Sequence, residues 1–250
     1  MCQAGFRFYA ELNDFLPPGR KQVAFTHHFK GRVSIKDMIE SLGVPHTEVD
    51  LILINGASVD FSYLVRDGDR ISVYPVFESF DITPLVHLRP KPLRDPRFVL
   101  DIHLGKLAAY LRMLGFDALY RNDYADDELA RISSRERRTL LTKDRGLLKR
   151  NLVTHGYCVR ETNPREQVIE VLRRFDLYRL IAPFRRCIRC NGWLEPVPKD
   201  EIMHRLPPQT GQYYDDFRMC QSCGQLYWKG SHYQRMQQLI EYVLQQNPKD

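Results

Sequence analysis

The sequence lacks any long apolar run. No stretch reaches the roughly 18 to 20 uncharged apolar residues that a membrane helix needs. The opening residues, MCQAGFRFYAELNDF, show no basic segment followed by an apolar block, which a secretory signal would require. Internal repeats and low-complexity tracts are also missing. We therefore expect a soluble, cytoplasmic protein without a membrane anchor.

The chain also lacks a recognisable covalent nucleophile. Ser133 and Ser134 have no elbow motif around them, and Cys158 lies in an apolar stretch with no evident base nearby. If the protein is a hydrolase, we expect it to activate water and to form no covalent intermediate.

Cysteines are few, and four of the six fall into two C-x-x-C pairs, Cys187/Cys190 and Cys220/Cys223, with 29 residues between the pairs. In a chain without a secretory signal, this spacing favours metal binding over disulfides. Two such pairs predict a four-thiolate tetrahedral site for a structural zinc ion. Cys2 and Cys158 remain outside this pattern and are expected to be inert.

The net charge of +6 is unevenly distributed along the chain. Residues 1–81 carry 8 Lys and Arg against 11 Asp and Glu, residues 82–180 carry 20 against 13, and residues 181–250 carry 9 against 7. The basic excess lies in the middle, where a polyanion such as RNA would be attracted, although a basic cluster can equally be a solvated helix face.

Residues 1–81 show the pattern of a β-grasp fold. Alternation predicts strands at 6–11 and 22–29, and a serine N-cap opens a helical pattern at 34–42. Strand patterns at 50–56 and 70–77 follow, the first running into an Asn-Gly turn. Residues 82–97 contain four prolines and show neither the alternation of a strand nor the periodicity of a helix, which predicts an extended linker.

From residue 98 onward, short apolar strands alternate with amphipathic helices. This order predicts a three-layer α/β/α domain with a mainly parallel sheet. Asp101 ends one apolar strand, FVLD, and Asp144 ends another, TLLTKD, while Asp126 and Asp127 open a helix between them. The carboxyl ends of neighbouring parallel strands face one crevice, so these acids can meet.

A group of carboxylates is what hard divalent cations prefer as ligands, and a bound Mg²⁺ or Mn²⁺ can activate water for phosphodiester hydrolysis. The alternative is purely structural. Asp126 also suits a helix N-cap, and Asp144 also suits a turn.

The segment LDIHLGKLAAYLRMLGFDALYRND, followed by DDELARIS and RTLLTKDRGLLKR, resembles the PIN-like nuclease family named after the C-terminal RNase domain of the Mut-seven protein. The resemblance extends from residue 98 to about 180 and continues into the cysteine-rich tail. It implies a metal-dependent ribonuclease with acids at Asp101, Asp126 and Asp144, and Asp127 can replace Asp126. A fourth acid stays open between Glu161 and Asp123.

Several further side chains near these acids have candidate roles. Thr142 can position Asp144 or a metal-bound water. Four cations are candidates for holding RNA phosphates, although at most one of the first two is expected to reach the crevice: Lys106, Arg112, Lys143 and Arg145.

The phrase LILINGASVD, followed by LVRDGDRISVYPVF, resembles the ubiquitin-like sulfur-carrier family over residues 5–80. Carriers of that family act through a free C-terminal Gly-Gly, whereas here the strand continues into FESFDITPL. The resemblance therefore implies the fold but disfavours sulfur transfer. We expect this region to recruit a protein partner or to orient RNA.

In the tail, aromatic and basic residues around the cysteines can either grip nucleic acid or form the small core of a zinc ribbon. We expect Trp193 to be a core residue and leave Trp228 open between the two roles. The last segment, YQRMQQLIEYVLQQN, predicts an amphipathic helix that packs on the ribbon or on a partner.

The sequence thus predicts a β-grasp domain at 1–81, a linker at 82–97, a PIN-like domain at 98–180 and a zinc ribbon with a helix at 181–250. The expected function, implied by the resemblance, is a metal-dependent ribonuclease that hydrolyses RNA phosphodiester bonds. The alternative is a non-catalytic RNA-binding adaptor that uses the ribbon and the basic face.

Overall fold

The computed structural model describes residues 1–75, 88, 96–207 and 209–247. It divides into two compact units, one formed by Met1–Asp95 with Ala125–Cys158 and the other by Pro96–Tyr124 with Val159–Asp250. The linker expected at 82–97 lies almost wholly outside the described residues. The domain limits inferred from the sequence stay a prediction.

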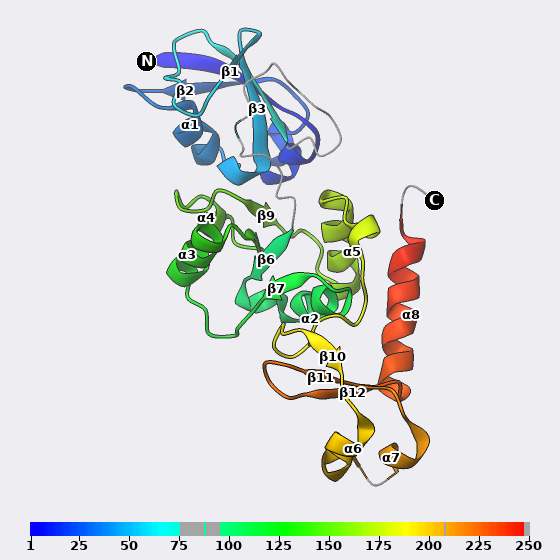
Figure 1. Ribbon diagram of the computed structural model, residues 1–250. Helices are drawn as coiled ribbons and strands as arrows, with labels where there is room; N and C mark the ends of the chain where they lie inside the picture. Colours follow the sequence, from blue (N-terminus) through cyan, green and yellow to red (C-terminus); the bar gives the residue numbers. More distant parts are fainter. Residues whose placement is uncertain (76–87, 89–95, 208, 248–250) are drawn as a thin grey trace. The chain divides into compact units, whose positions relative to one another are not determined.

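The first unit begins with a five-stranded sheet in the order β2-β1-β5-β3-β4, seen in blue and cyan in Figure 1. Its elements are β1 (Cys2–Phe8), β2 (Phe25–Phe29), α1 (Ile35–Ser41), β3 (Val49–Ile54), β4 (Ala57–Val59) and β5 (Arg70–Pro75), with 3-10 helices η1 (Ala10–Phe15), η2 (Pro18–Arg20) and η3 (His46–Glu48). The central pair β1 and β5 is parallel, and the other pairs are antiparallel. This is the expected β-grasp arrangement, and we call residues 1–75 the β-grasp domain.

The local sequence explains these elements. Ala4, Phe6 and Phe8 alternate into the core of β1, as a half-buried strand requires. The side chain of Ser34 caps α1 by accepting a hydrogen bond from the Asp37 N–H at 3.1 Å.

Both strands expected at the start are shorter than predicted. The strand expected at 6–11 ends at Phe8, and the strand expected at 22–29 begins at Phe25. Ala10 and Gln22 adopt positive φ angles of 46° and 59°, which interrupt an extended chain. Ala10 instead opens the 3-10 helix η1.

The remainder of the first unit holds α3 (Asp126–Glu136), β8 (Thr139–Thr142), α4 (Arg145–Leu148) and β9 (Gly156–Cys158). Strands β8 and β9 are parallel, with Thr142 opposite Cys158. Helix α3 ends at Glu136, and its C-cap residue Arg137 has a φ of 50°, in the left-handed region.

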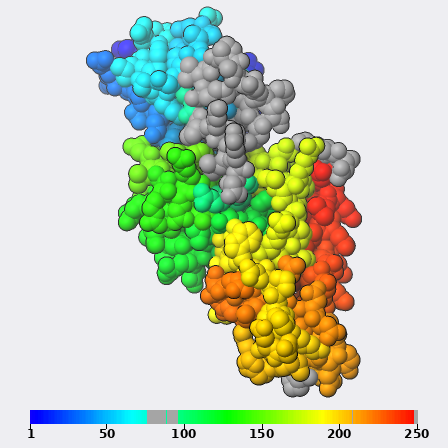
Figure 2. Space-filling view, in the orientation of Figure 1, coloured from blue at the N-terminus to red at the C-terminus, as the bar shows by residue number. Residues whose placement is uncertain are grey.

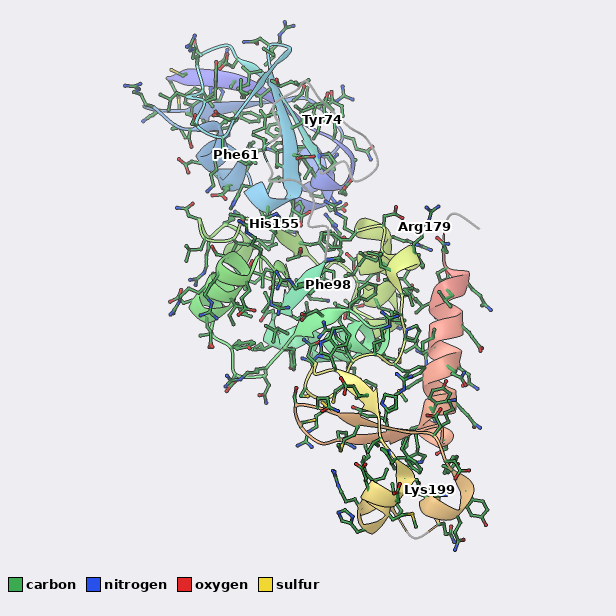
Figure 3. The ribbon with its side chains drawn as sticks, in the orientation of Figure 1. Phe61, Tyr74, Phe98, His155, Arg179 and Lys199 are labelled. Carbon is green, nitrogen blue, oxygen red and sulfur yellow. The ribbon has the colours of Figure 1, made fainter. Side chains whose placement is uncertain are left out.

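The second unit contains the strands β6 (Arg97–Leu100) and β7 (Asp117–Leu119), which are parallel, with η4 (Ile102–Leu104), α2 (Gly105–Met113), α5 (Pro164–Arg174) and η5 (Tyr178–Leu180). Phe98, labelled in Figure 3, lies in the core. It meets the rings of Phe116 and Phe175 edge-on, with distances between ring centroids of 6.4 and 5.8 Å. Asn163 caps α5 by accepting from the Arg165 N–H at 2.9 Å.

Among the described residues, four strands lie outside the β-grasp sheet and the cysteine-rich tail: β8 and β9 in the first unit, and β6 and β7 in the second. Both pairs with a described register, β6/β7 and β8/β9, are parallel. Together with the β-grasp sheet and the cysteine-rich tail, this confirms the mixed α/β fold class expected from the sequence.

The tail of the second unit is a three-stranded antiparallel ribbon made of β10 (Leu194–Pro196), β11 (Phe217–Cys220) and β12 (Leu226–Trp228). The short helices α6 (Lys199–Ile202), η6 (Met203–Arg205) and α7 (Thr210–Tyr213) lie between β10 and β11, and α8 (Ser231–Gln245) follows β12. Helix α8 contacts α5, and in this contact the Tyr242 hydroxyl donates a hydrogen bond to Glu166 Oε1 at 3.0 Å.

The two tryptophans of the ribbon lie in different environments. Trp193 is 53% exposed, so the prediction that it forms the core is wrong. Trp228 instead packs against the cluster of Val197, Ile202, Phe217 and Leu226. No helix in the described part of the chain combines the length and the hydropathy needed to cross a membrane.

Candidate catalytic carboxylates and metal centre

Asp101 lies immediately after β6 and is only 6% exposed. It is the N-cap of the 3-10 helix η4, and its Oδ1 accepts a hydrogen bond from the Ile102 N–H at 2.6 Å. A buried carboxylate at the end of a strand is held in one orientation by this cap. The sequence-based placement of Asp101 at the end of a strand is therefore correct.

Asp144 follows β8 by two residues and caps α4. Its Oδ1 accepts from the Gly146 N–H at 2.7 Å, and its own N–H donates to Thr142 Oγ1 at 2.9 Å. Thr142 is fully buried, whereas Asp144 is exposed. A buried hydroxyl thus holds the backbone of an exposed acid, as expected for Thr142.

Asp126 and Asp127 form the first turn of α3, where negative charge suits the helix dipole. Both are exposed and both form ion pairs with Arg150, which lies 3.6 Å from Asp126 and closer to Asp127. Ala125 occupies the N-cap position and makes no side-chain cap, so neither aspartate is the N-cap that the structural alternative suggested.

Neither candidate for a fourth acid is distinguished by the structure. Asp123 is exposed and pairs with Arg121 at 2.6 Å. That hydrogen bond lowers the pKa of the Asp123 carboxyl. Glu161 is exposed, and its backbone N–H donates to Glu170 Oε2 at 3.0 Å.

The four candidate RNA-binding cations have different environments. Lys106 and Lys143 are exposed. The guanidinium of Arg145 donates to the Phe15 carbonyl at 3.3 Å and lies over the Phe15 ring. Arg112 is 4% exposed, and burial lowers the pKa of its guanidinium. Its environment does not favour the predicted contact with RNA.

The four paired cysteines form a metal-sized cluster. The Sγ atoms of Cys187, Cys190, Cys220 and Cys223 all lie within 4.8 Å of one another. Those of Cys187 and Cys223 are 3.7 Å apart, and those of Cys190 and Cys220 are 3.4 Å apart. Tetrahedral zinc, with Zn–S bonds of about 2.3 Å, separates its sulfurs by about 3.8 Å, so the cluster fits this ion. Among the described residues, no other group of three or more His, Cys, Asp or Glu side chains is gathered in this way.

Each C-x-x-C pair is followed by a residue in the left-handed region. Asn191 has a φ of 71° and Gly224 a φ of 68°. The Asn191 N–H donates to the Cys187 carbonyl at 2.8 Å, and the Gly224 N–H donates to the Cys220 carbonyl at 2.9 Å. Asn and Gly are the residues that tolerate this backbone best, so both turns suit their sequence.

The thiols respond differently to the shared environment. Burial raises the pKa of the Cys190 thiol to about 12. Burial also acts to raise that of Cys220, but hydrogen bonds from the Cys223 and Ser222 N–H groups outweigh it and lower this pKa to about 7. Four crowded sulfurs cannot all be anionic without a compensating cation, which is what a metal ion supplies.

Comparison with known families gives two matches that follow the chain's organisation. A model described as the Mut7-C RNAse domain matches residues 96–240, which is more than half of the chain. The chain belongs to the Mut7-C RNAse domain family. A second model, described as Mut7-C ubiquitin, matches residues 1–81 and so contains the β-grasp domain. No curated protein and no solved structure matches the chain.

The Mut7-C RNAse domain contains an internal link that the sequence did not reveal. The buried guanidinium of Arg112, on α2, donates to the carbonyls of Ile188 and Arg189, both at 3.0 Å, and to that of Ala118 at 2.7 Å. Ile188 and Arg189 are the two residues inside the first C-x-x-C pair. Arg112 therefore joins the cysteine cluster to α2 and β7.

A second link uses Asn191. Its Nδ2 donates to Asp117 Oδ1 at 2.7 Å, and its Oδ1 accepts from the Ala118 N–H at 3.0 Å. Asp117 also lies 3.5 Å from Arg186, whose guanidinium covers the exposed ring of Trp193 at 4.2 Å. The cysteine-rich ribbon of the Mut7-C RNAse domain is thus joined to the edge strand β7 by polar side chains.

Proposed function

We propose that the protein is a metal-dependent ribonuclease in which Asp101, Asp144 and either Asp126 or Asp127 are the catalytic carboxylates. The observation that carries the proposal is the match of the Mut7-C RNAse domain over residues 96–240, a range that contains all of these acids. A bound Mg²⁺ or Mn²⁺ would supply activated water and neutralise negative charge on the phosphodiester.

The protein's own residues have separate tasks in this proposal. Asp101 follows β6, Asp144 lies two residues beyond β8, and their caps hold the carboxylates in defined orientations. Asp126 and Asp127 are exposed, and both carboxylates pair with Arg150. A divalent cation would compete with Arg150 for these carboxylates.

RNA contact is proposed for Lys106 and Lys143, which are exposed and keep their charged ends free to meet phosphates. Arg145 is proposed to contribute less to RNA contact, because its guanidinium already lies over the Phe15 ring. Arg112 is left to the structural role described above.

We also propose that the cysteine cluster holds a structural zinc ion. All four positions of a tetrahedral shell are filled by Cys187, Cys190, Cys220 and Cys223, so no position remains for a substrate or a catalytic water. The free thiols of the cluster suit the reducing conditions of the cytoplasm, where we propose that the protein acts.

The test is cleavage of labelled linear and circular RNAs by the full-length protein with Mn²⁺ or Mg²⁺, with EDTA as a control. We expect Asp144→Asn to lower the rate by at least about 100-fold, because even the residues that support metal ligands contribute 10- to 100-fold in such sites. Asparagine caps a helix as well as aspartate does, so the melting temperature should be unchanged.

The matched control is Asp200→Asn, which makes the same change at an exposed position on α6 and should leave the rate unchanged. Cutting of the circular RNA identifies endonucleolytic action. Tight RNA binding without cutting under either metal would reject the nuclease and support the RNA-binding adaptor.

A further inference from the structure

The β-grasp domain contacts the segment 125–158 of its own unit over several separate positions. Thr47 and Glu48, in η3, are 1% and 0% exposed, so this corner of the domain is buried. The space-filling view shows the blue and cyan domain continuous with the green surface of this segment (Figure 2). Figure 3 labels Phe61, a residue of the β-grasp domain, and His155, a residue of the segment 125–158.

Two of these contacts hold the two ends of α4. At its first residue, Arg145 donates to the Phe15 carbonyl at 3.3 Å and lies over the Phe15 ring at 4.9 Å. Immediately after its last residue, the Lys149 ammonium donates to the Glu40 carbonyl at 2.6 Å. The N-cap of this helix is Asp144.

Other contacts hold β9 and the loop that leads into it. Glu48 Oε1 accepts from the N–H of Cys158, the residue opposite Thr142, at 2.7 Å. The His46 Nε2–H donates to the Val153 carbonyl at 3.1 Å. Gly156 lies against both sides of this contact: a Cβ there would be 3.5 Å from Thr47, an ordinary contact, and 2.6 Å from the end of the Leu148 side chain, which would have to move.

A helix as short as α4 has no stability of its own in water, since four residues form about one turn. Its position must come from tertiary contacts. The buried residues Leu147 and Leu148 anchor one side, and the β-grasp domain supplies the polar contacts at both ends.

We infer that the β-grasp domain acts within its own chain as a clamp that positions α4, and with it the carboxylate of Asp144. Lys149 and Arg145 are the positioning residues of this clamp. The inference rests on the proposed function in one respect, namely that Asp144 binds the catalytic cation. It differs from the expected role in recruiting a partner, because this surface of the domain is used within the chain.

The test is Lys149→Met in the full-length protein, which removes the ammonium and keeps the aliphatic stem. Losing one hydrogen bond from a charged group should make amide exchange in residues 144–150 about five-fold faster or more. The affinity for Mn²⁺, measured by calorimetry, should fall by a similar factor. The rate of RNA cleavage should fall through kcat, while KM for RNA stays the same.

Lys30→Met is the matched control, because Lys30 is an exposed lysine of the same domain outside these contacts. Lys149→Arg should restore slow exchange and Mn²⁺ affinity, which a general loss of stability would not explain. Arg145→Met is the second variant and should accelerate exchange in the same residues.

Unchanged exchange in residues 144–150 in both Lys149→Met and Arg145→Met would overturn the clamp. Faster exchange in a protein whose unaltered form neither binds Mn²⁺ nor cuts RNA would leave the clamp standing and reject the proposed function. The two ideas therefore fail separately.

Discussion

The cysteine cluster and the proposed catalytic carboxylates differ in how the chain prepares them. The four sulfurs lie within 4.8 Å of one another, come from two turns of one ribbon, and are joined through Arg112 and Asn191 to the neighbouring strand and helix. The carboxylates come from three separate elements, and those of Asp126, Asp127 and Asp144 are exposed.

This difference matches the tasks of two kinds of metal ion. A structural zinc contributes binding energy to folding, so its ligands are best gathered together, and two of the four here, Cys187 and Cys220, are also buried. A hard catalytic cation keeps water in its shell and exchanges with solvent, so exposed oxygen ligands suit it. We therefore expect changes at the cysteines to affect stability and changes at the acids to affect chemistry.

The largest effect on stability should come from Cys220→Ser. A structural zinc provides on the order of 10 kcal/mol of binding energy to folding, so loss of one thiolate should unfold the ribbon and lower the melting temperature sharply. Zinc content by mass spectrometry and thermal unfolding measure this. Cys2→Ser, outside the cluster, should keep both values, and a Cys220→Ser protein with full zinc and unchanged melting would refute the structural role.

A smaller loss is expected for Arg112→Lys. Lysine keeps the charge but cannot reach the carbonyls of Ile188, Arg189 and Ala118 together, so we expect a loss of about 3 kcal/mol in the free energy of unfolding. Denaturant unfolding provides the measurement. Lys106→Ala on the same helix should cost less than about 0.5 kcal/mol. If lysine fully replaced Arg112, the link between the ribbon and α2 would not contribute to stability.

The smallest stability effect should come from Arg150→Gln. Exposed ion pairs contribute little, so the free energy of unfolding should change by less than about 0.5 kcal/mol. Removal of the competing guanidinium should instead strengthen Mn²⁺ binding several-fold, as calorimetry can show. Lys199→Gln, which breaks the ion pair with Asp215, should leave Mn²⁺ binding unchanged. Weaker Mn²⁺ binding in Arg150→Gln would contradict the proposed competition.

Much of this arrangement was predictable, because the determining residues are close in sequence. Each C-x-x-C pair sets its own turn, and alternation in β1 or the N-cap at Ser34 depends only on neighbouring residues. The acids at Asp101 and Asp144 were found because the first directly follows an apolar strand and the second lies two residues beyond one.

Other features were missed because their partners are distant in sequence. Arg112 looks like any basic residue on a helix, and it is buried only because carbonyls 76 and 77 positions away accept its hydrogen bonds. The exposure of Trp193 was missed as well. The sequence left Trp228 open, and its partial burial against Phe217 was decided by how the ribbon strands pair.

The sequence by itself determined the β-grasp pattern, the parallel strands followed by acids, and the paired cysteines, since local spacing and polarity encode each of them. Only the tertiary structure decided that Arg112 serves the ribbon and that Lys149 and Arg145 meet the β-grasp domain. The physical reason is that a cation acquires its role from the acceptors that folding brings within hydrogen-bond distance, and these acceptors are backbone carbonyls, which carry no signature in the sequence.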